Sequence, residues 1–268
     1  MAKKKEKKSK PIKKWLGRIV FLVALCVFVY SAFKIFEIKK ANYDEKKEVE
    51  SLREEIEIEK DENLDSFRVD FNKFTQYPDV FAWIVVKDTE ISYPVVKGKD
   101  NEYYLTHTFS GASNYAGAIF MDYRQKTDFS EYNTFVYGHN VLHGTMFAEL
   151  QNYMDKTFFE KHPYVYLYTK TGSYKLQVYS AYQDKGDSAS YRLHFSSQND
   201  YGSYLSYVKG LSKYDSGVSM DANDHMVTLY TCSYEGSTNS EYVDERYFVH
   251  LKMIEALEGE MPYGEAKQ

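Results

Sequence analysis

The residue best suited to nucleophilic chemistry in this sequence is Cys232, which ends the segment 226–232. The apolar, aromatic and β-branched residues of this segment are typical of a strand, and the polar, glycine-containing residues 233–237 indicate that the strand ends there. A thiol at the rim of a sheet can meet a substrate, and the alternative is a small buried apolar residue. The second cysteine, Cys26, lies in an apolar N-terminal segment, so we expect no intramolecular disulfide.

A histidine is a common partner of a nucleophilic cysteine, and the sequence contains seven histidines. His139 directly follows a predicted strand at 133–138, which places it at a sheet edge as well. His139 and His143 also have the four-residue spacing of a helical zinc pair. Asn140 stands where that motif has its glutamate, and glycines on both sides disfavour a helix, so we predict no zinc site.

Arg246 begins the last predicted strand, 14 residues after Cys232. If the two strands are adjacent and antiparallel, the start of one lies beside the end of the other, and Arg246 lies next to Cys232. A guanidinium stays protonated at working pH, so it can stabilise a developing oxyanion or orient a carbonyl group. The alternative is a solvated arginine. His250, within the same strand, is expected to have a structural role.

The aromatic content, with 27 tyrosines and 17 phenylalanines, favours strands. Seven or eight short strands separated by turn signals predict a mainly β domain that is closed or sandwiched. The predicted strands cover residues 81–86, 91–96, 116–121, 133–138, 164–169, 173–183, 226–232 and 246–253. The predicted helices cover residues 37–62, 63–76, 145–161 and 199–211.

The N-terminal region has the pattern of a membrane anchor. Residues 15–36 are almost entirely apolar, with Arg18 and Lys34 placed where their side chains can reach the headgroups, and the length is roughly the ~20 residues a spanning helix needs. A cleaved signal peptide is the alternative, but the small-residue cleavage pattern is poor. The lysine-rich residues 1–14 predict a cytoplasmic N-terminus, with all that follows the anchor outside the cell.

Charge and cysteine content exclude several classes of protein. The formal net charge is −5, and residues 1–14 carry +7 of it, so the remainder carries −12. An acidic domain without a basic stripe argues against nucleic-acid binding. Two cysteines exclude a disulfide framework. Asp122, Asp128 and Glu131 are near one another, but we expect them in a solvated loop rather than at a calcium site.

At its chemistry-bearing residues the chain resembles the class B sortases. Residues 228–232 (TLYTC) fit the TLxTC signature, His139 follows Tyr137-Gly138, and Arg246 heads the final strand. Residues 98–105, residues 118–122, the paired N-terminal helices and the helix-bearing insertion before the cysteine strand also match class B features. The resemblance covers about residues 65–255.

The resemblance implies a closed β-barrel of about eight strands that acts as a cysteine transpeptidase without a cofactor or a metal. Cys232 would attack a carbonyl in a C-terminal sorting signal of a secreted protein, and a cell-wall amine would resolve the thioacyl intermediate. His139 would act as general acid and then as base, and Arg246 would hold the substrate and the oxyanion. The implied domains are a cytoplasmic tail (1–14), an anchor (15–36), a spacer helix (37–64), a catalytic domain (65–256) and a flexible tail (257–268).

By the same similarity, further residues would bind the substrate peptide. Arg192 stands where relatives tend to have an apolar residue, and Tyr230 where they tend to have serine, which affects the expected peptide specificity. The implied substrate-binding residues are Asn101, Leu105, Ser188, Tyr191, Arg192, Tyr230 and Thr231.

Three alternatives to a wall-anchoring transpeptidase remain at the level of sequence. A pilin-polymerising sortase usually carries a second membrane segment, and we find no second apolar run of spanning length after residue 36. A cysteine protease would differ in that water resolves the intermediate. A membrane-tethered adhesion or scaffold domain would keep Cys232 buried, so its thiol would not react with a labelling reagent.

Overall fold

The computed structural model describes residues 11–55, 69–141, 144–232 and 245–257 of the chain. The chain divides into two compact units, Met1–Lys46 and Lys47–Gln268. The described part of the first unit is helical, and the second unit contains the strands. Residues 1–10 and 258–268 of the expected tails, residues 63–68 of the expected helix at 63–76, and His143 lie outside the described residues.

Helix α1 (Pro11–Glu55) is uninterrupted, so the expected anchor at 15–36 and most of the expected spacer helix form a single element. Within it, the segment Trp15–Leu52 contains a window of mean hydropathy 2.5 and is long and apolar enough to cross a membrane. The last turns of α1 belong to the second unit. There Val49 and Leu52, which lie three residues apart on one face of the helix, are buried in the hydrophobic core.

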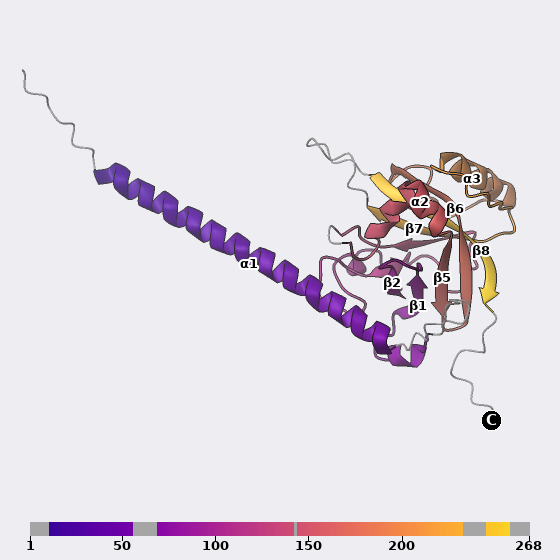
Figure 1. The fold of residues 1–268 in the computed structure, drawn as a ribbon, viewed down its shortest axis with the longest axis horizontal. Coiled ribbons are helices and arrows are strands. Elements are labelled where there is room, and N and C mark those ends of the chain that lie inside the picture. The colour runs from indigo at the N-terminus through magenta and orange to yellow at the C-terminus, as the bar shows by residue number, and fades with distance from the viewer. Residues whose placement is uncertain (1–10, 56–68, 142–143, 233–244, 258–268) are drawn as a thin grey trace, which may run out of the picture. The chain divides into compact units, whose positions relative to one another are not determined.

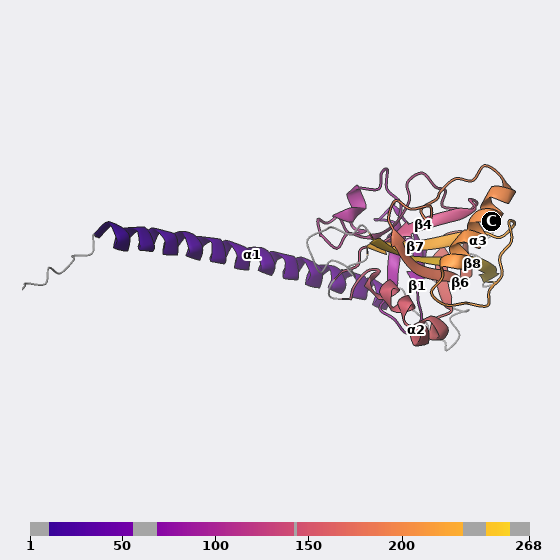
Figure 2. The same ribbon diagram turned by 90° about the horizontal axis from the view of Figure 1, so that it is seen from above.

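The second unit is a closed barrel of eight strands in the order β1-β2-β3-β4-β7-β8-β6-β5, which confirms the predicted fold (Figures 1 and 2). The pairs β2–β3 and β4–β7 are parallel, and the other pairs are antiparallel. Closure leaves no free edge at which another chain could add a strand. The strands are β1 (Val80–Val85), β2 (Ser92–Val96), β3 (Ile119–Met121), β4 (Asn133–Tyr137), β5 (Tyr164–Thr169), β6 (Gly172–Lys185), β7 (Met226–Cys232) and β8 (Glu245–Leu257).

Two details of the strands follow from single residues. Pro94 pairs with Trp83 in β1, whereas the ladder between β2 and β3 begins only at Val95, so the missing N–H of Pro94 removes no bond from that second ladder. The expected strand at 116–121 begins only at Ile119. Gly117 has a φ of +65°, and a Cβ there would lie 2.4 Å from the carbonyl oxygen of Tyr104, so this position forms a turn.

The predicted helix at 145–161 is two elements, η4 (Ala148–Met154) and α2 (Lys156–Lys161). Asp155 between them is extended, and its side chain caps α2 by accepting a hydrogen bond from the backbone N–H of Phe158. In the described part of the predicted helix at 63–76, η2 (Phe71–Phe74) is a short 3₁₀ turn whose Phe74 is buried. A further 3₁₀ turn, η3 (Tyr103–Leu105), lies in the connection between β2 and β3.

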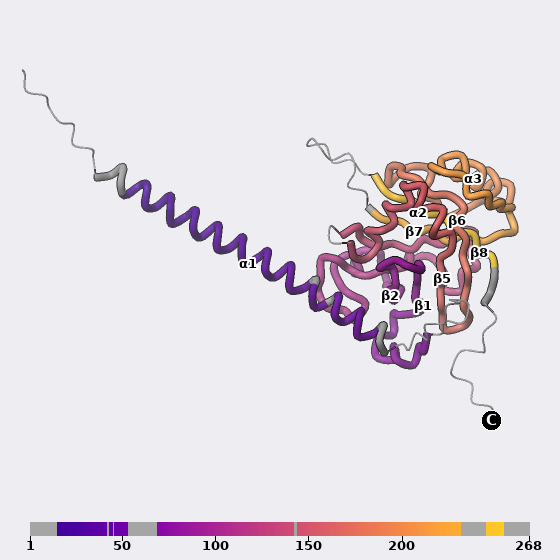
Figure 3. Tube along the Cα trace, viewed as in Figure 1, coloured from indigo at the N-terminus to yellow at the C-terminus, as the bar shows by residue number. Residues whose placement is uncertain are grey.

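The insertion between β6 and β7 carries α3 (Gln198–Leu211), close to the predicted helix at 199–211. Figures 1 and 3 show α3 against the outside of the barrel beside β6 and β8. The hydroxyl of Tyr179 in β6 donates to the carbonyl of Leu205 at 3.1 Å, and Ser180 donates to that of Val208 at 2.6 Å. These bonds fix the insertion to the barrel wall.

His250 in β8 has the structural role expected of it, because it is fully buried in a polar chain of contacts. Thr228 donates its hydroxyl proton to Asn133 at 2.6 Å, so it accepts from Nδ1 of His250 at 2.8 Å. Nε2 then accepts from the hydroxyl of Tyr182 at 2.9 Å. These partners fit the neutral ring protonated on Nδ1. Burial lowers the pKa of His250 from its usual value of 6.5 to about 3.

We expect the free energy of unfolding to fall as the pH drops below 6.5. The unfolded chain then binds a proton at His250 that the native state excludes until about pH 3. Between pH 7 and pH 5 the loss should be about 2 kcal/mol. Urea unfolding of the full chain in detergent at both pH values measures it. A His250→Gln variant should remove this part of the slope, and His162→Gln, at a half-buried histidine, should retain it. An unchanged slope in His250→Gln would contradict the assignment.

Candidate active site

Three neighbouring strands bring the expected catalytic positions into one row across the barrel. Cys232 at the end of β7 pairs directly with Arg246 near the start of β8, as the spacing predicted. On the other side of β7, β4 runs parallel to it, with Tyr137 opposite Tyr230. Parallel strands end at the same edge, so His139, two residues beyond Tyr137, is level with Cys232, two residues beyond Tyr230.

The backbone around His139 is tightly fixed. The N–H of Gly138 donates to the carbonyl of Tyr230 in β7 at 3.2 Å, and the carbonyl of His139 accepts from Phe147 at 3.0 Å. A Cβ at Gly138 would lie 2.4 Å from the side chain of Ile119 and 2.7 Å from that of Phe147. Only glycine fits at this point, so the chain can pass between the two side chains and present the next residue at the strand end.

The imidazole of His139 is partly exposed, and its Nε2 lies 2.8 Å from the carbonyl oxygen of Leu105. A carbonyl can only accept, so Nε2 carries a proton in this arrangement. Leu105 ends η3, and Ala118 at the start of the β3 segment donates to the carbonyl of Tyr104 at 2.9 Å. The loop that positions the imidazole is therefore itself fixed to the barrel.

Arg246 is half-buried, and its Nη1 donates to the carbonyl of Glu245 at 2.9 Å. Its guanidinium carbon lies 5.9 Å from the centre of the Tyr230 ring. This contact holds the cation over the strand that ends in Cys232. A positive charge beside a cysteine favours its thiolate, which is the nucleophilic form.

Three tyrosines form a cluster beside this row, which we call the tyrosine cluster: Tyr137, Tyr191 and Tyr230. The rings of Tyr137 and Tyr230 are 5.6 Å apart, and the ring of Tyr191, from the insertion, lies 5.6 Å from Tyr230. The cluster joins the insertion to the strands that carry the expected catalytic residues.

The comparisons with known proteins agree with this geometry. The family model described as the sortase domain matches residues 84–254. The chain is 34% identical over 249 residues to sortase B of Listeria monocytogenes, a match that covers 91% of this chain and 98% of that protein. The chain belongs to the sortase family.

Two further likenesses place this sortase in class B. It is 30% identical over 222 residues to sortase B of Staphylococcus aureus, covering 82% of this chain and 91% of that protein. The crystal structure of Staphylococcus aureus sortase B matches with a TM-score of 0.70 at 31% identity, covering 79% of this chain and 99% of that one. Sortases are cysteine transpeptidases, so this chain is an enzyme of that kind.

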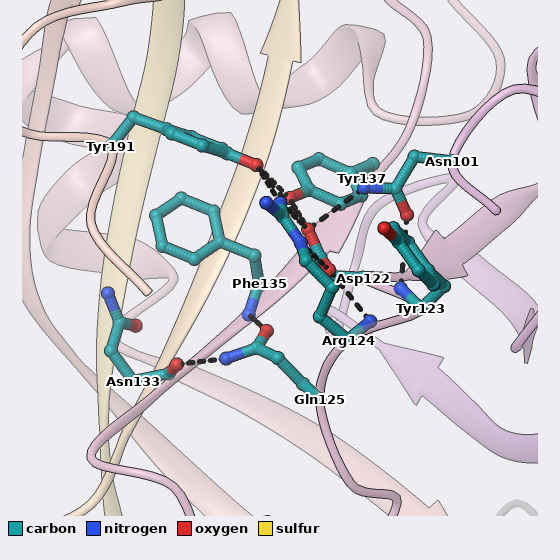
Figure 4. Close-up of polar contacts among 9 residues, drawn as sticks. All are labelled: Asn101, Asp122, Tyr123, Arg124, Gln125, Asn133, Phe135, Tyr137 and Tyr191. Atoms are coloured by element: carbon teal, nitrogen blue, oxygen red, sulfur yellow. Dashed lines mark hydrogen bonds and ion pairs between the residues drawn. The ribbon is translucent and has the colours of Figure 1, made fainter. Parts of the chain in front are cut away.

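The sortase contains a buried carboxylate next to the tyrosine cluster, shown in Figure 4. Asp122, directly after β3, is fully buried. This corrects the expectation that it lies in a solvated loop, although Asp128 in the same loop is exposed. Burial alone would raise the pKa of Asp122, but hydrogen bonds from Arg124, Tyr137 and Asn101 outweigh it and hold the pKa well below its usual range. Asp122 is therefore an ionised, internal acceptor.

The residues expected to bind substrate are placed as follows. Leu105 is exposed on η3, and Tyr230 is half-buried in the tyrosine cluster. Asn101 is half-buried, and its Nδ2 donates to Asp122 at 2.9 Å. Ser188 is half-buried in the turn before Tyr191, where its carbonyl accepts from the N–H of Tyr191 at 3.1 Å. Leu105 and Tyr230 thus contact His139 and Arg246, respectively, and Asn101 contacts Asp122.

Tyr191 belongs to the tyrosine cluster, whereas the side chain of Arg192 is ion-paired and that of Thr231 is buried. Arg192 makes two bonds from Nη2 to the carboxylate of Asp200 in α3, at 2.8 and 2.7 Å, and its guanidinium lies over the ring of Phe195. Thr231 is 1% exposed, which leaves its backbone as the part able to meet a peptide. Arg192 as placed stabilises the insertion, and a contact with a substrate would require this ion pair to open.

Sequence inspection missed the set of contacts around Asp122. Its members come from the β2–β3 connection, from β4 and from the insertion, and none of their spacings indicates a common site. One local signal was present: Asp122 and Arg124 follow a predicted strand two residues apart, which suits a bidentate pair in a tight turn.

Proposed function

We propose that this sortase cleaves a C-terminal sorting signal of secreted proteins and joins them to an amine of the cell wall. The observation that carries the proposal is the row formed by His139, Cys232 and Arg246 across β4, β7 and β8. A solved structure similar to this chain is described as a Staphylococcus aureus sortase B–substrate complex, at 31% identity. That likeness supports a peptide as the first substrate.

The proposed reaction has two acyl transfers. The thiolate of Cys232 attacks a backbone carbonyl of the sorting signal, and the oxyanion is stabilised by Arg246. The peptide C–N bond breaks as His139 gives a proton to the leaving amine, which leaves a thioacyl enzyme. His139 then takes a proton from the incoming amine, whose nitrogen attacks the thioester and releases the thiolate. Asn101, Leu105, Ser188, Tyr191, Arg192, Tyr230 and Thr231 are proposed to bind the peptide.

We also propose that α1 anchors the enzyme as a single-pass membrane protein with its catalytic unit on the extracellular face. The apolar stretch of α1 and the lysines at 1–14 support this topology. A secreted substrate in transit is itself tethered to the membrane, so confinement of enzyme and substrate to one surface raises their effective concentration. Cysteine labelling of intact cells, with a single cysteine placed before residue 10 or after residue 258, tests the orientation.

Intact-mass spectrometry of the full chain in detergent micelles tests the reaction. The chain is mixed with short peptides that carry sorting-type motifs, and then with an oligoglycine as acceptor amine. We expect an adduct on Cys232 that disappears when the amine is added, as a peptide–amine product forms. Release of free peptide acid alone would indicate a protease. An absent adduct together with an unlabelled Cys232 in the folded enzyme would support the scaffold alternative.

A further inference from the structure

Asp122 stands out because one buried carboxylate receives hydrogen bonds from three separate parts of the chain. Its Oδ1 accepts from the backbone N–H and the Nε of Arg124 at 3.0 and 2.8 Å. Its Oδ2 accepts from Nη2 of Arg124 at 2.6 Å, from Asn101 at 2.9 Å, and from the hydroxyls of Tyr137 at 2.6 Å and Tyr191 at 3.4 Å. The acceptor capacity of a carboxylate is thus filled.

The directions of these bonds fix the rotors of two tyrosines. Tyr137 donates its only hydroxyl proton to Asp122, so at the 2.7 Å contact between the two hydroxyls Tyr191 is the donor. The oxygen of Tyr191 in turn accepts from Nη2 of Arg124 at 2.9 Å. Arg124, Tyr191, Tyr137 and Asp122 therefore form a closed ring of bonds, in which the hydroxyl proton of Tyr191 points to Tyr137 and to Asp122.

Asn101 is oriented by the same carboxylate. Its Nδ2 donates to Asp122, and its Oδ1 accepts from the backbone N–H of Tyr123 at 3.1 Å, so the amide cannot flip without losing both bonds. Figure 4 shows Asn101 and Tyr191 approaching Asp122 from opposite sides. One comes from the connection between β2 and β3, and the other from the insertion before α3.

The position of Asp122 is itself fixed by the barrel. Its backbone N–H donates to the carbonyl of Phe135 in β4 at 3.1 Å, and its carbonyl accepts from Gln125 at 3.1 Å. The side chain of Gln125, 1% exposed, accepts from the N–H of Phe135 at 2.7 Å. The carboxylate is therefore attached to the strand that leads to His139, while it holds two segments that have no ladder of their own.

We propose that Asp122 is a positioning residue for the transfer reaction, which holds Asn101 and Tyr191 in the one arrangement that receives the peptide. The inference rests on the proposed function, because Asn101 and Tyr191 are two of the residues proposed there to bind the peptide. Asp122 acts through the residues that it holds, because its carboxylate accepts from Asn101, Tyr137 and Tyr191. Loss of the Asp122 carboxylate should weaken peptide binding and leave the arrangement of His139, Cys232 and Arg246 unchanged.

The kinetic test compares Asp122→Asn with wild type in the full chain, using the peptide and oligoglycine assay. The asparagine side chain has the same shape as that of aspartate, but its NH₂ group is a donor and cannot accept the hydrogen bonds that the carboxylate oxygen accepted. We expect KM for the peptide to rise about 10- to 100-fold with kcat within about threefold of wild type, the pattern of lost binding in both ground and transition state. The rate of Cys232 alkylation by iodoacetamide should stay within about twofold of wild type.

A matched control is Asp128→Asn, which removes the same charge six residues away. Asp128 is exposed and accepts only from its neighbour Ser130 among the bonds found in the described residues. The Asp128→Asn variant should have the KM and kcat of wild type. A merely structural role for Asp122 would instead lower kcat through a smaller folded fraction at unchanged KM, and that result would overturn the proposal.

A double-mutant cycle tests whether Asp122 acts through Tyr191. If it does, Tyr191→Phe and Asp122→Asn should raise KM together by less than the product of their separate effects. A multiplicative effect would show that the two residues act independently and would overturn this part of the proposal.

Hydrogen exchange separates failure of this inference from failure of the proposed function. In Asp122→Asn the amides of residues 98–107 and 186–193 should exchange at least about tenfold faster, with β6 and β8 unchanged. This comparison needs no substrate. If wild type transfers no peptide, the proposed function fails, and the exchange rates still decide whether Asp122 positions the two segments. Unchanged exchange in both segments would overturn the positioning role.

Discussion

Substitution of Cys232 by alanine is expected to abolish the formation of thioacyl enzyme and to lower transfer by about 10⁴- to 10⁶-fold, the range seen when an enzyme loses its covalent nucleophile. In the proposed reaction His139 transfers protons and Arg246 stabilises charge, so neither residue replaces the thiol as the nucleophile. Intact mass after incubation with peptide measures the adduct, and chromatography of the peptide–amine product measures turnover.

The sequence supplies its own control for this experiment. Cys26, the other cysteine, lies in the apolar part of α1. Cys26→Ala should therefore form the adduct and turn over at the wild-type rate, while Cys232→Ala does neither. An adduct that remains in Cys232→Ala, or one that disappears in Cys26→Ala, would show that the nucleophile has been assigned to the wrong residue.

The part of the site that could be predicted from sequence is the part that local patterns determine. The residues of 226–232 favour a strand that ends at Cys232, and the 14-residue separation predicted Arg246 beside Cys232 on the condition that the two strands are adjacent and antiparallel, as they are. The strand ends were predicted within a few residues because turn residues follow them. For His139 the sortase resemblance implied a catalytic role, but neither it nor the spacing gave the strand that pairs with β4.

The parts that could not be predicted depend on contacts between distant segments. Nothing local shows that β4 pairs in parallel with β7, since 88 residues lie between Tyr137 and Met226. Asp122 lies in a polar stretch that is typical of a solvated loop, and besides its neighbour Arg124 its carboxylate is bonded by Asn101 and Tyr137, which lie in other segments of the chain. Sequence periodicity also cannot show that Asp155 interrupts the helix expected at 145–161 by capping α2.

The second large effect is expected for Arg246. Arg246→Ala should lower kcat and kcat/KM together by about 10²- to 10³-fold, the usual loss when one oxyanion donor is removed. The equal effect on both constants follows if the guanidinium acts on charge that develops only in the transition state. Steady-state kinetics with the peptide and oligoglycine substrates measures both constants. Lys185→Ala removes an exposed cation from β6, next to the residue that pairs with Arg246, and should change neither constant more than about twofold.

Arg246→Lys distinguishes the two contributions that the guanidinium can make. Lysine keeps the positive charge beside Cys232 but loses the planar fork that can hold an oxygen with two N–H groups. If charge near the thiol is the main contribution, the lysine variant should recover most of the activity and most of the thiolate, measured as the pH at which alkylation of Cys232 is half-maximal. If the fork holds the oxyanion, the alkylation profile should recover while kcat stays at least about tenfold low. Turnover of Arg246→Ala within a few-fold of wild type would exclude both contributions and leave the contact with Tyr230 as the role of this residue.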